Sequence, residues 1–211
     1  MLVTESHSDQ VEVWPKEGRH ILAQYDDSTI VVYQAYRPSI GRFAAEQGKF
    51  GGEFSYSRMS WVKPNFLWMM YRSGWGTKEG QEVTLALRLR LAFFDSLLAE
   101  AVPSSWDRDL FTTEEEWSQA VARSSVRLQW DPDHHPSGAP LERRAIQLGL
   151  RGVALEAFGR RELLEVIDLS DFVAEQRSRL SSTGASALLI PRERVYLPKD
   201  PEMAARLKLS V

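Results

Sequence analysis

The chain has 211 residues, of which 43% are hydrophobic and 26% are charged, and its formal net charge is -3. These values are ordinary for a globular protein of one domain and exclude a polycationic nucleic-acid coat. The absence of cysteine excludes disulfides and thiolate chemistry and fits a reducing cytoplasm, and neither a membrane-length apolar run nor a secretion signal is apparent. We therefore expect a cytoplasmic protein without a membrane segment.

The first half of the chain predicts an arm, a strand and two short helices. Residues 1–19 are polar and predict a loose N-terminal arm, ahead of a single domain over residues 20–211. Thr29–Tyr36 is β-branched and aromatic and follows turn-forming residues, so it predicts a buried strand. Ser39–Gln47 and Asn65–Tyr71 predict short helices, each ended by a glycine.

The second half predicts further strands and helices. Gln81–Arg90 alternates loosely, which is typical of a strand with one wet face. Thr113 and Glu116 have the spacing of a capping box, so a helix is expected from Thr113 to Arg123. The other expected elements are a helix at Leu91–Ala101, a strand at Val126–Trp130, a turn-rich loop at Asp131–Gly138, apolar segments at Arg144–Leu150 and Leu163–Asp168, a helix at Ser170–Leu180, and a closing hairpin of Ala187–Ile190 and Arg194–Leu197 around Pro191.

About six strands mixed with short helices, without the long helices of a doubly wound sheet, predict an α+β fold. No G-x-S-x-G, Walker, G-x-G-x-x-G or H-E-x-x-H motif is present, which argues against the enzyme classes that carry them. Adjacent His134 and His135 lie close to Asp131 and Asp133, but they lack the i, i+4 spacing of a helical metal pair and no third histidine is near. We therefore expect no metal site.

Basic and aromatic residues gather in one part of the chain. Residues 37–78 hold seven basic and two acidic side chains, and residues 33–75 hold eleven of the 22 aromatic side chains. Cations interleaved with aromatic rings suit a ligand with phosphates and a flat base. The alternative is that the rings belong to the core and the cations to a solvated rim. Arg72, set among Trp68, Tyr71 and Trp75, needs either a structural ion pair or a bound anion.

Four blocks of sequence resemble the uncharacterised family called domain of unknown function 4291. The resemblance covers roughly residues 20–180, and the long second block makes it specific. The family name implies no activity. The blocks are Tyr25–Asp27 with Thr29–Tyr36, Arg58–Trp75, Gln129–Pro132 and Arg144–Leu150.

The order of elements is also similar to that of ADP-ribosyltransferase-like proteins, including the RNA 2′-phosphotransferases. Tyr33-Gln34 stands where those proteins have a Tyr-His pair, and Ser60 stands where their second strand carries a serine. Arg144–Leu148 stands where they have an Arg, two residues and a Glu, so that Gln147 replaces the catalytic glutamate. An amide orients a ribose hydroxyl but carries no negative charge to stabilise an oxocarbenium-like transition state. The resemblance therefore implies a nucleotide cleft rather than simple ADP-ribosyl transfer.

This second resemblance implies a split mixed or antiparallel sheet, with Thr29–Tyr36 and Arg144–Leu150 as its paired central strands. Gln34 and Gln147 would then face each other across one cleft, in the positions of catalytic residues. The implied cofactor is NAD or a related nucleotide. The residues expected to bind it are Tyr36, Arg37, Ser60, Lys63, Tyr71, Arg72, Trp75 and Arg144.

Three functional hypotheses follow. The first is a nucleotide-binding protein, either an NAD-dependent transferase that modifies RNA, a protein or a small molecule, or a protein that only binds the nucleotide. The second is a nucleic-acid-binding module without catalysis, which needs a long open groove. The third is a structural or interaction protein whose aromatic residues all belong to the core.

Overall fold

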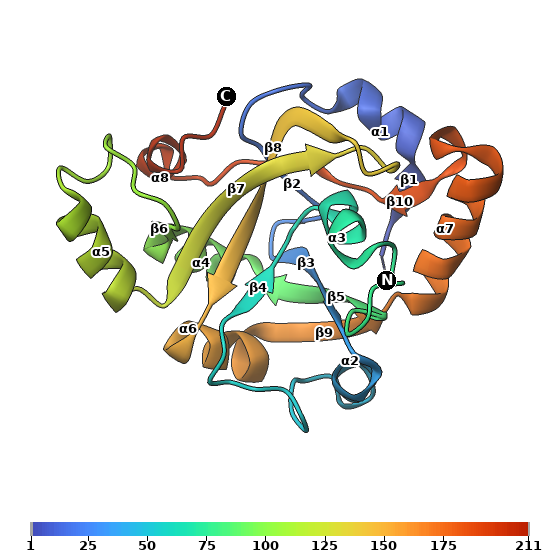
Figure 1. Cartoon of the computed structure of the whole chain (residues 1–211), viewed down its shortest axis with the longest axis horizontal. Helices are drawn as coiled ribbons and strands as arrows, with labels where there is room; N and C mark the ends of the chain where they lie inside the picture. The colour runs from blue at the N-terminus through green and yellow to red at the C-terminus, as the bar shows by residue number, and fades with distance from the viewer. Residues whose placement is uncertain (1, 211) are drawn as a thin grey trace.

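Two sheets meet at the centre of the fold (Figure 1). The first is antiparallel and has the order β3-β5-β9. The second has the order β4-β8-β7-β6, in which β6 runs parallel to β7 and the other neighbours are antiparallel. The strands of the first sheet are β3 (Thr29–Tyr36), β5 (Val83–Arg90) and β9 (Leu163–Asp168), and those of the second are β4 (Ser60–Val62), β6 (Val102–Pro103), β7 (Val126–His134) and β8 (Pro140–Leu150).

A short bridge joins the two sheets. Tyr33 on β3 and Lys63, directly after β4, exchange backbone hydrogen bonds of 2.6 and 3.2 Å. The bridge brings the end of β3 beside the end of β4. Polar side chains that leave these two strands therefore reach the same space.

The structure is a computed structural model that describes residues 2–210, and these residues form one α+β domain with short helices, as the sequence predicts. Positions 1 and 211, the outer ends of the expected arm and domain, lie outside the described residues. Within residues 2–210 we find no helix that combines the length and apolarity needed to span a bilayer. The helices are α1 (His7–Val13), α2 (Pro38–Gln47), α3 (Phe66–Ser73), α4 (Leu91–Glu100), α5 (Glu114–Arg123), α6 (Gly152–Ala157) with a following π-helical turn (Phe158–Glu162), α7 (Ser170–Thr183), a 3-10 turn (Ala185–Ala187) and α8 (Pro201–Arg206).

Strand β3 has the bounds that the sequence predicts, and it is buried on both faces. Ile30 and Val32 belong to one core cluster, and Val31 and Tyr33 belong to the other. The alternation of a strand explains this division, because successive side chains point to opposite faces. Gln34 continues the row of Ile30 and Val32, so it also starts from a buried face.

The predicted end of α2 and start of α5 are confirmed by their caps, whereas α2 begins at Pro38, with Arg37 as its N-cap, rather than at the expected Ser39. Helix α2 ends at Gly48, whose φ of 65° is left-handed and favours glycine. Helix α5 carries the expected capping box between Thr113 and Glu116. Local sequence therefore fixes these boundaries.

The expected loose arm is wrong for residues 4–14. Strand β1 (Thr4–Ser6) pairs with β10 (Leu189–Pro191), and α1 follows it. The Trp14 ring is buried, and its Nε1 donates to the Glu193 carbonyl oxygen at 3.0 Å. This polar segment is ordered because it packs against the opposite end of the chain. Local composition does not predict such a distant contact.

Three other expectations are wrong for related reasons. The two C-terminal strands form no hairpin, because β10 pairs with β1 while β11 (Arg194–Tyr196) pairs with β2 (Ile21–Ala23). Strand β5 has no wet face along most of its length, because Leu85 and Leu87 pack in one core cluster and Ala86 packs in the other. Strand β7 continues to His134, through residues expected to form a loop, because β8 pairs with it beyond Asp131.

The expected pairing of the two central strands is also wrong. Strand β3 pairs with β5, whereas β8, which contains Arg144–Leu150, pairs with β4 and β7. The two strands belong to different sheets, which are joined by the Tyr33–Lys63 bridge. Their side chains therefore approach each other across a cavity rather than along a hydrogen-bonded ladder.

Candidate functional site

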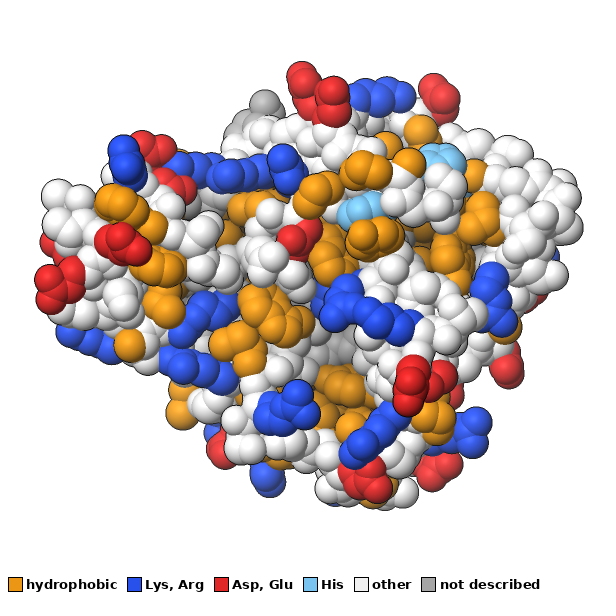
Figure 2. Space-filling model, in the orientation of Figure 1, with side chains coloured by type: hydrophobic (Ala, Val, Ile, Leu, Met, Phe, Trp, Pro, Cys, Tyr) orange, Lys and Arg blue, Asp and Glu red, His pale blue; other side chains and the backbone are white. Residues whose placement is uncertain are grey.

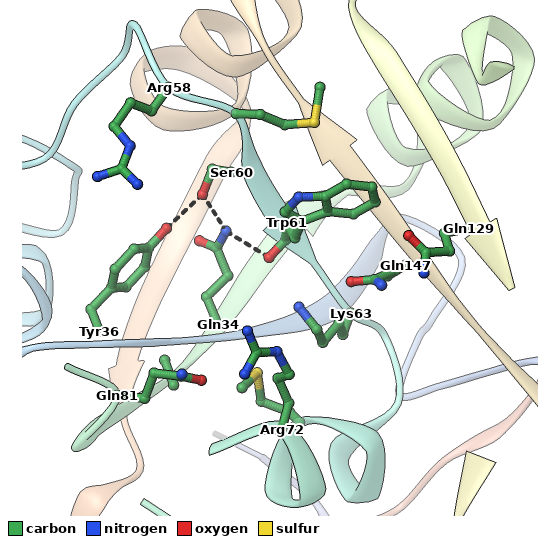
Figure 3. A pocket seen from close by; sticks show the side chains of 13 residues that line it. Gln34, Tyr36, Arg58, Ser60, Trp61, Lys63, Arg72, Gln81, Gln129 and Gln147 are labelled. Carbon is green, nitrogen blue, oxygen red and sulfur yellow. Dashed lines mark hydrogen bonds between the residues drawn. The ribbon is translucent and has the colours of Figure 1, made fainter. Parts of the chain in front are cut away.

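A cavity of about 530 Å³ opens where the ends of β3 and β4, helix α3 and the β7–β8 pair come together. Figure 2 shows that the face in view is hollowed between α2 and α3, with Lys and Arg side chains around the hollow. The side chains that line the cavity are polar or cationic with a few apolar neighbours (Figure 3). They are Gln34, Ala35, Tyr36, Arg58, Met59, Ser60, Trp61, Lys63, Met69, Arg72, Gln81, Gln129 and Gln147.

One wall is a hydrogen-bonded group formed by β3 and β4. Gln34 Nε2 donates to Ser60 Oγ at 2.8 Å and to the Trp61 carbonyl oxygen at 3.0 Å. The Tyr36 hydroxyl shares a 2.7 Å hydrogen bond with Ser60 Oγ, and burial raises the pKa of Tyr36 well above its ordinary value. Gln34 Oε1 is buried and has no hydrogen-bond partner within residues 2–210. A buried acceptor without a donor lowers the stability of the fold.

The opposite wall holds two amides on one carboxylate. Gln129 on β7 and Gln147 on β8 are direct cross-strand partners. Gln129 Nε2 donates to Asp131 Oδ1 at 2.8 Å, and Gln147 Nε2 donates to Asp131 Oδ2 at 2.7 Å. Since Asp131 takes the amide nitrogens, Gln147 presents its carbonyl oxygen to the cavity (Figure 3). This wall therefore offers hydrogen-bond acceptors.

Three cations reach the cavity without an acidic partner. Arg58, Lys63 and Arg72 line it, and no carboxylate of residues 2–210 lies within ion-pair distance of any of them. Desolvation and then the nearby Arg72 lower the pKa of Lys63 to about 7, against the opposing effect of Asp131. Lys63 Nζ lies 5.0 Å from the centre of the Trp68 ring.

Helix α3 holds Arg72 in place through a buried anchor at its start. The Asn65 side chain caps the helix by accepting a backbone hydrogen bond from three residues ahead. Glu193, from the far end of the chain, accepts from the Phe66 amide at 2.7 Å and from Asn65 Nδ2 at 3.3 Å. Burial raises the pKa of Glu193 well above its usual range. Arg72 lies in the last turn, where a cation also suits the helix dipole.

The structure brings six of the ten predicted site residues to this cavity. Gln34 and Gln147 both line it, although they lie on different sheets. Both are buried, at 3% and 9% exposure, so neither lies on a wet sheet face. The other four are Tyr36, Ser60, Lys63 and Arg72.

The remaining four predicted residues do not line the cavity. Arg37 lies beyond the end of β3, where it forms a 2.7 Å ion pair with Glu53. Arg144 is exposed on β8, and the odd spacing from Gln147 places it on the opposite face of that strand. Both positions follow from strand geometry once the ends and faces of the strands are known.

Tyr71 and Trp75 are engaged elsewhere. The Tyr71 ring stacks on the His134 ring, with 3.5 Å between centroids. Trp75 is buried in the core, and its Nε1 donates to the Pro136 carbonyl oxygen at 3.2 Å. Trp75 therefore belongs to the core, whereas Tyr71 packs on His134 and stays exposed.

Sequence reasoning missed Arg58, Trp61, Gln81 and Gln129 as lining residues. Arg58 and Trp61 belong to the dense block around Ser60, and Gln129 opens the block that ends at Pro132, so their places in the blocks that carry the family resemblance were a signal. The cross-strand register that pairs Gln129 with Gln147 was not readable from one sequence.

His134 and the acidic neighbour Asp133 have other partners in the fold. Asp133 forms a buried ion pair with Arg143, at 2.5 Å, and His134 stacks on Tyr71. Within the described part of the chain, no three His, Asp or Glu side chains are grouped so as to hold a metal ion.

Comparison with known proteins identifies the family. No curated protein matches the chain. The family model described as a domain of unknown function, DUF4291, matches residues 20–196. This range covers most of the chain and confirms the resemblance carried by the four sequence blocks. The chain therefore belongs to the DUF4291 family.

Proposed function

We propose that this protein binds a nucleotide of the NAD or ADP-ribose kind in the cavity between β3, β4, α3 and the β7–β8 pair. The observation that carries the proposal is the set of cations at the cavity. Arg58 and Arg72 lack an ion pair to any carboxylate of residues 2–210, and no acidic side chain lines the cavity. Unpaired guanidinium groups suit the two phosphates of a dinucleotide, which accept in a bidentate manner.

The neutral groups of the cavity suit the rest of such a ligand. Gln147 Oε1 would accept from a ribose hydroxyl. Trp61 offers a flat surface for a base or a nicotinamide ring. The Gln147 amide holds ribose without charge, so binding is the core of the proposal. Transfer of ADP-ribose, to RNA or to another acceptor, is the further reaction that an ADP-ribosyltransferase-like protein would perform.

The cavity favours a single nucleotide over a nucleic-acid strand. A volume of about 530 Å³ is in the range of small-ligand and cofactor pockets. A strand without base recognition would instead need a long cationic groove with successive stacking rings. Of the aromatic residues around it, Tyr71 and Trp75 are already engaged with His134 and Pro136.

The test is a thermal-shift screen followed by calorimetry with NAD, ADP-ribose, ATP and a short RNA. We expect NAD or ADP-ribose to raise the melting temperature, and Arg58→Ala and Arg72→Ala each to weaken binding by about 10-fold or more. Arg72→Lys should not restore affinity, because the two-pronged contact is lost. Arg123→Ala, on the distant and exposed part of α5, is the matched control and should bind like wild type.

Other outcomes decide between the hypotheses. Stabilisation by RNA alone would support a nucleic-acid-binding module. Stabilisation by none of the four compounds would favour the structural hypothesis. Equal affinity of the Arg72→Ala and Arg123→Ala variants for NAD would refute the assignment of this cavity.

A further inference from the structure

Lys63 occupies a position that anion binding alone does not explain. Its backbone is held by the two hydrogen bonds to Tyr33, and Pro64 follows it directly. Its side chain is 6% exposed, and its amine points into the cavity between Gln34 and Arg72 (Figure 3). Within residues 2–210 this amine has neither a hydrogen-bond acceptor nor a carboxylate in ion-pair contact, and it lies over the face of the Trp68 ring. A surface lysine that only attracts phosphate would not be buried in this way.

We propose that Lys63 is a nucleophilic amine that forms an imine with a sugar aldehyde carried by a phosphorylated ligand. This inference rests on the proposed nucleotide site, which would hold the phosphates. The substrate class is a phosphorylated ribose with a free C1, such as the terminal ribose of ADP-ribose in its open-chain form.

The environment of the amine supports a neutral, reactive form. A buried ammonium without a carboxylate or an acceptor is costly, and a second cation nearby makes it more so. The charged groups that act on Lys63 are Arg72 from α3 and Asp131 from β7, and desolvation with Arg72 brings its pKa to about 7. Lysines that form Schiff bases are activated by these same two effects, an apolar pocket and a neighbouring cation.

The reaction balances without a further reactant. The lone pair of Lys63 Nζ attacks C1 of the aldehyde, and a C–N bond forms while the C=O π bond breaks. A proton moves from the nitrogen to the former carbonyl oxygen and gives a carbinolamine. Loss of water then leaves the C=N bond. Gln147 would orient the sugar hydroxyls during this step, and Arg58 and Arg72 would hold the phosphates.

The experiment is reductive trapping. Wild-type protein is incubated with ADP-ribose and sodium cyanoborohydride at pH 7, and the product is analysed by intact mass and by peptide mapping. We expect one adduct whose mass is that of ADP-ribose less one oxygen atom, located at Lys63. An ordinary exposed lysine has roughly 10³-fold less neutral amine at this pH, so labelling at Lys63 should be at least about 10-fold faster than at exposed Lys78. Lys78→Arg is the control and should be trapped like wild type.

Lys63→Arg separates chemistry from charge. Arginine keeps a cation in the site but forms no imine with the aldehyde, so this variant should lose the adduct while calorimetry still detects binding of ADP-ribose. A protein that binds ADP-ribose in calorimetry but is not trapped at Lys63 overturns the nucleophile and leaves the nucleotide site intact. If ADP-ribose does not bind, glyceraldehyde serves as the probe, because it needs no phosphate contact. Selective trapping of glyceraldehyde at Lys63 then supports the reactive amine while the nucleotide proposal fails, and labelling of Lys63 no faster than Lys78 overturns it.

Discussion

Gln147 donates a 2.7 Å hydrogen bond to Asp131, and this contact fixes which end of the Gln147 amide faces the cavity. Gln129 donates to the other oxygen of the same carboxylate at 2.8 Å. Asp131 therefore orients two amides at once, and its negative charge lies behind the cavity wall. A glutamate at position 147 would meet that charge directly.

The first prediction concerns Gln147→Glu. Two carboxylates that share the site of one hydrogen bond repel each other, so the pKa of the new carboxyl is raised in the folded state. A carboxyl with a raised folded-state pKa stabilises the fold only while it is protonated. We therefore expect the variant to approach wild-type stability near pH 4 and to be about 1–3 kcal/mol less stable at pH 7.

Urea denaturation of both proteins at the two pH values measures this difference, and the comparison with wild type at each pH cancels the other titrating groups. A variant that is equally stable relative to wild type at pH 4 and pH 7 would contradict the Gln147–Asp131 contact. The same protein, incubated with NAD, tests whether a carboxylate at this position allows cleavage of the nicotinamide bond.

The second prediction separates ligand-binding arginines from structural ones. Arg72 is exposed and has no ion pair to a carboxylate of residues 2–210, so Arg72→Ala should change the free energy of unfolding of the ligand-free protein by no more than about 0.5 kcal/mol. Arg143 is 5% exposed and pairs with the buried Asp133. Arg143→Ala leaves the Asp133 charge unpaired and should lower the free energy of unfolding by about 3–5 kcal/mol. Chemical denaturation measures both values. A large loss for Arg72→Ala would assign it a structural role.

The sequence predicts the parts of this fold that local chemistry determines. The bounds of β3 follow from its β-branched and aromatic residues, and the end of α2 follows from Gly48. The cluster of cations and aromatic rings around Lys63 and Arg72 also pointed to the part of the chain that lines the cavity. These features depend on residues close together in the chain.

What could not be predicted depends on distant partners. The order of residues 4–14 comes from β10 and Glu193, and the pairing of Gln129 with Gln147 comes from the register of β7 and β8. Tyr71 and Arg72 are neighbours in sequence, but the helix turns one toward His134 and the other toward the cavity. The two residues share the same local sequence, so only the packing of the helix shows which of them faces the cavity.

The third prediction concerns the anchor of α3. Glu193 is fully buried and accepts from the Phe66 amide at 2.7 Å. Glu193→Ala leaves that amide unpaired and should cost about 1–3 kcal/mol. Because the pKa of Glu193 is raised, its ionisation destabilises the fold as the pH rises. Glu193→Gln keeps an acceptor without the charge, so above neutral pH it should be at least as stable as wild type.

Denaturation of the Ala and Gln variants at pH 8 distinguishes the two contributions. If Glu193→Gln lowered the stability as much as Glu193→Ala, the carboxylate charge itself would be required, and the buried group would have to be ionised. If neither variant lost stability, the anchor would not determine the position of α3.

The last prediction uses the titration of Lys63 itself. Its pKa falls from 10.5 to about 7 on folding, mainly by desolvation and then by Arg72, against the opposing effect of Asp131. Between these two pH values the unfolded chain binds the proton and the folded protein does not, so this lysine makes the fold more stable as the pH rises through that window. Below pH 7 the buried ammonium lowers the free energy of unfolding. Each pKa unit corresponds to about 1.4 kcal/mol.

The stability of two variants at position 63, relative to wild type, should therefore change with pH in a defined direction. Lys63→Met removes the charge at every pH, so it should be more stable than wild type at pH 6, and this advantage should shrink by pH 9.5. Lys63→Arg stays charged throughout, so its deficit relative to wild type should grow over the same interval. Urea denaturation at pH 6, 7.5 and 9.5 measures both trends, with Lys78→Met as the exposed control whose difference from wild type should stay constant. Constant differences for the two Lys63 variants as well would show that the amine titrates like a surface lysine, and the chemistry proposed for it would lose its basis.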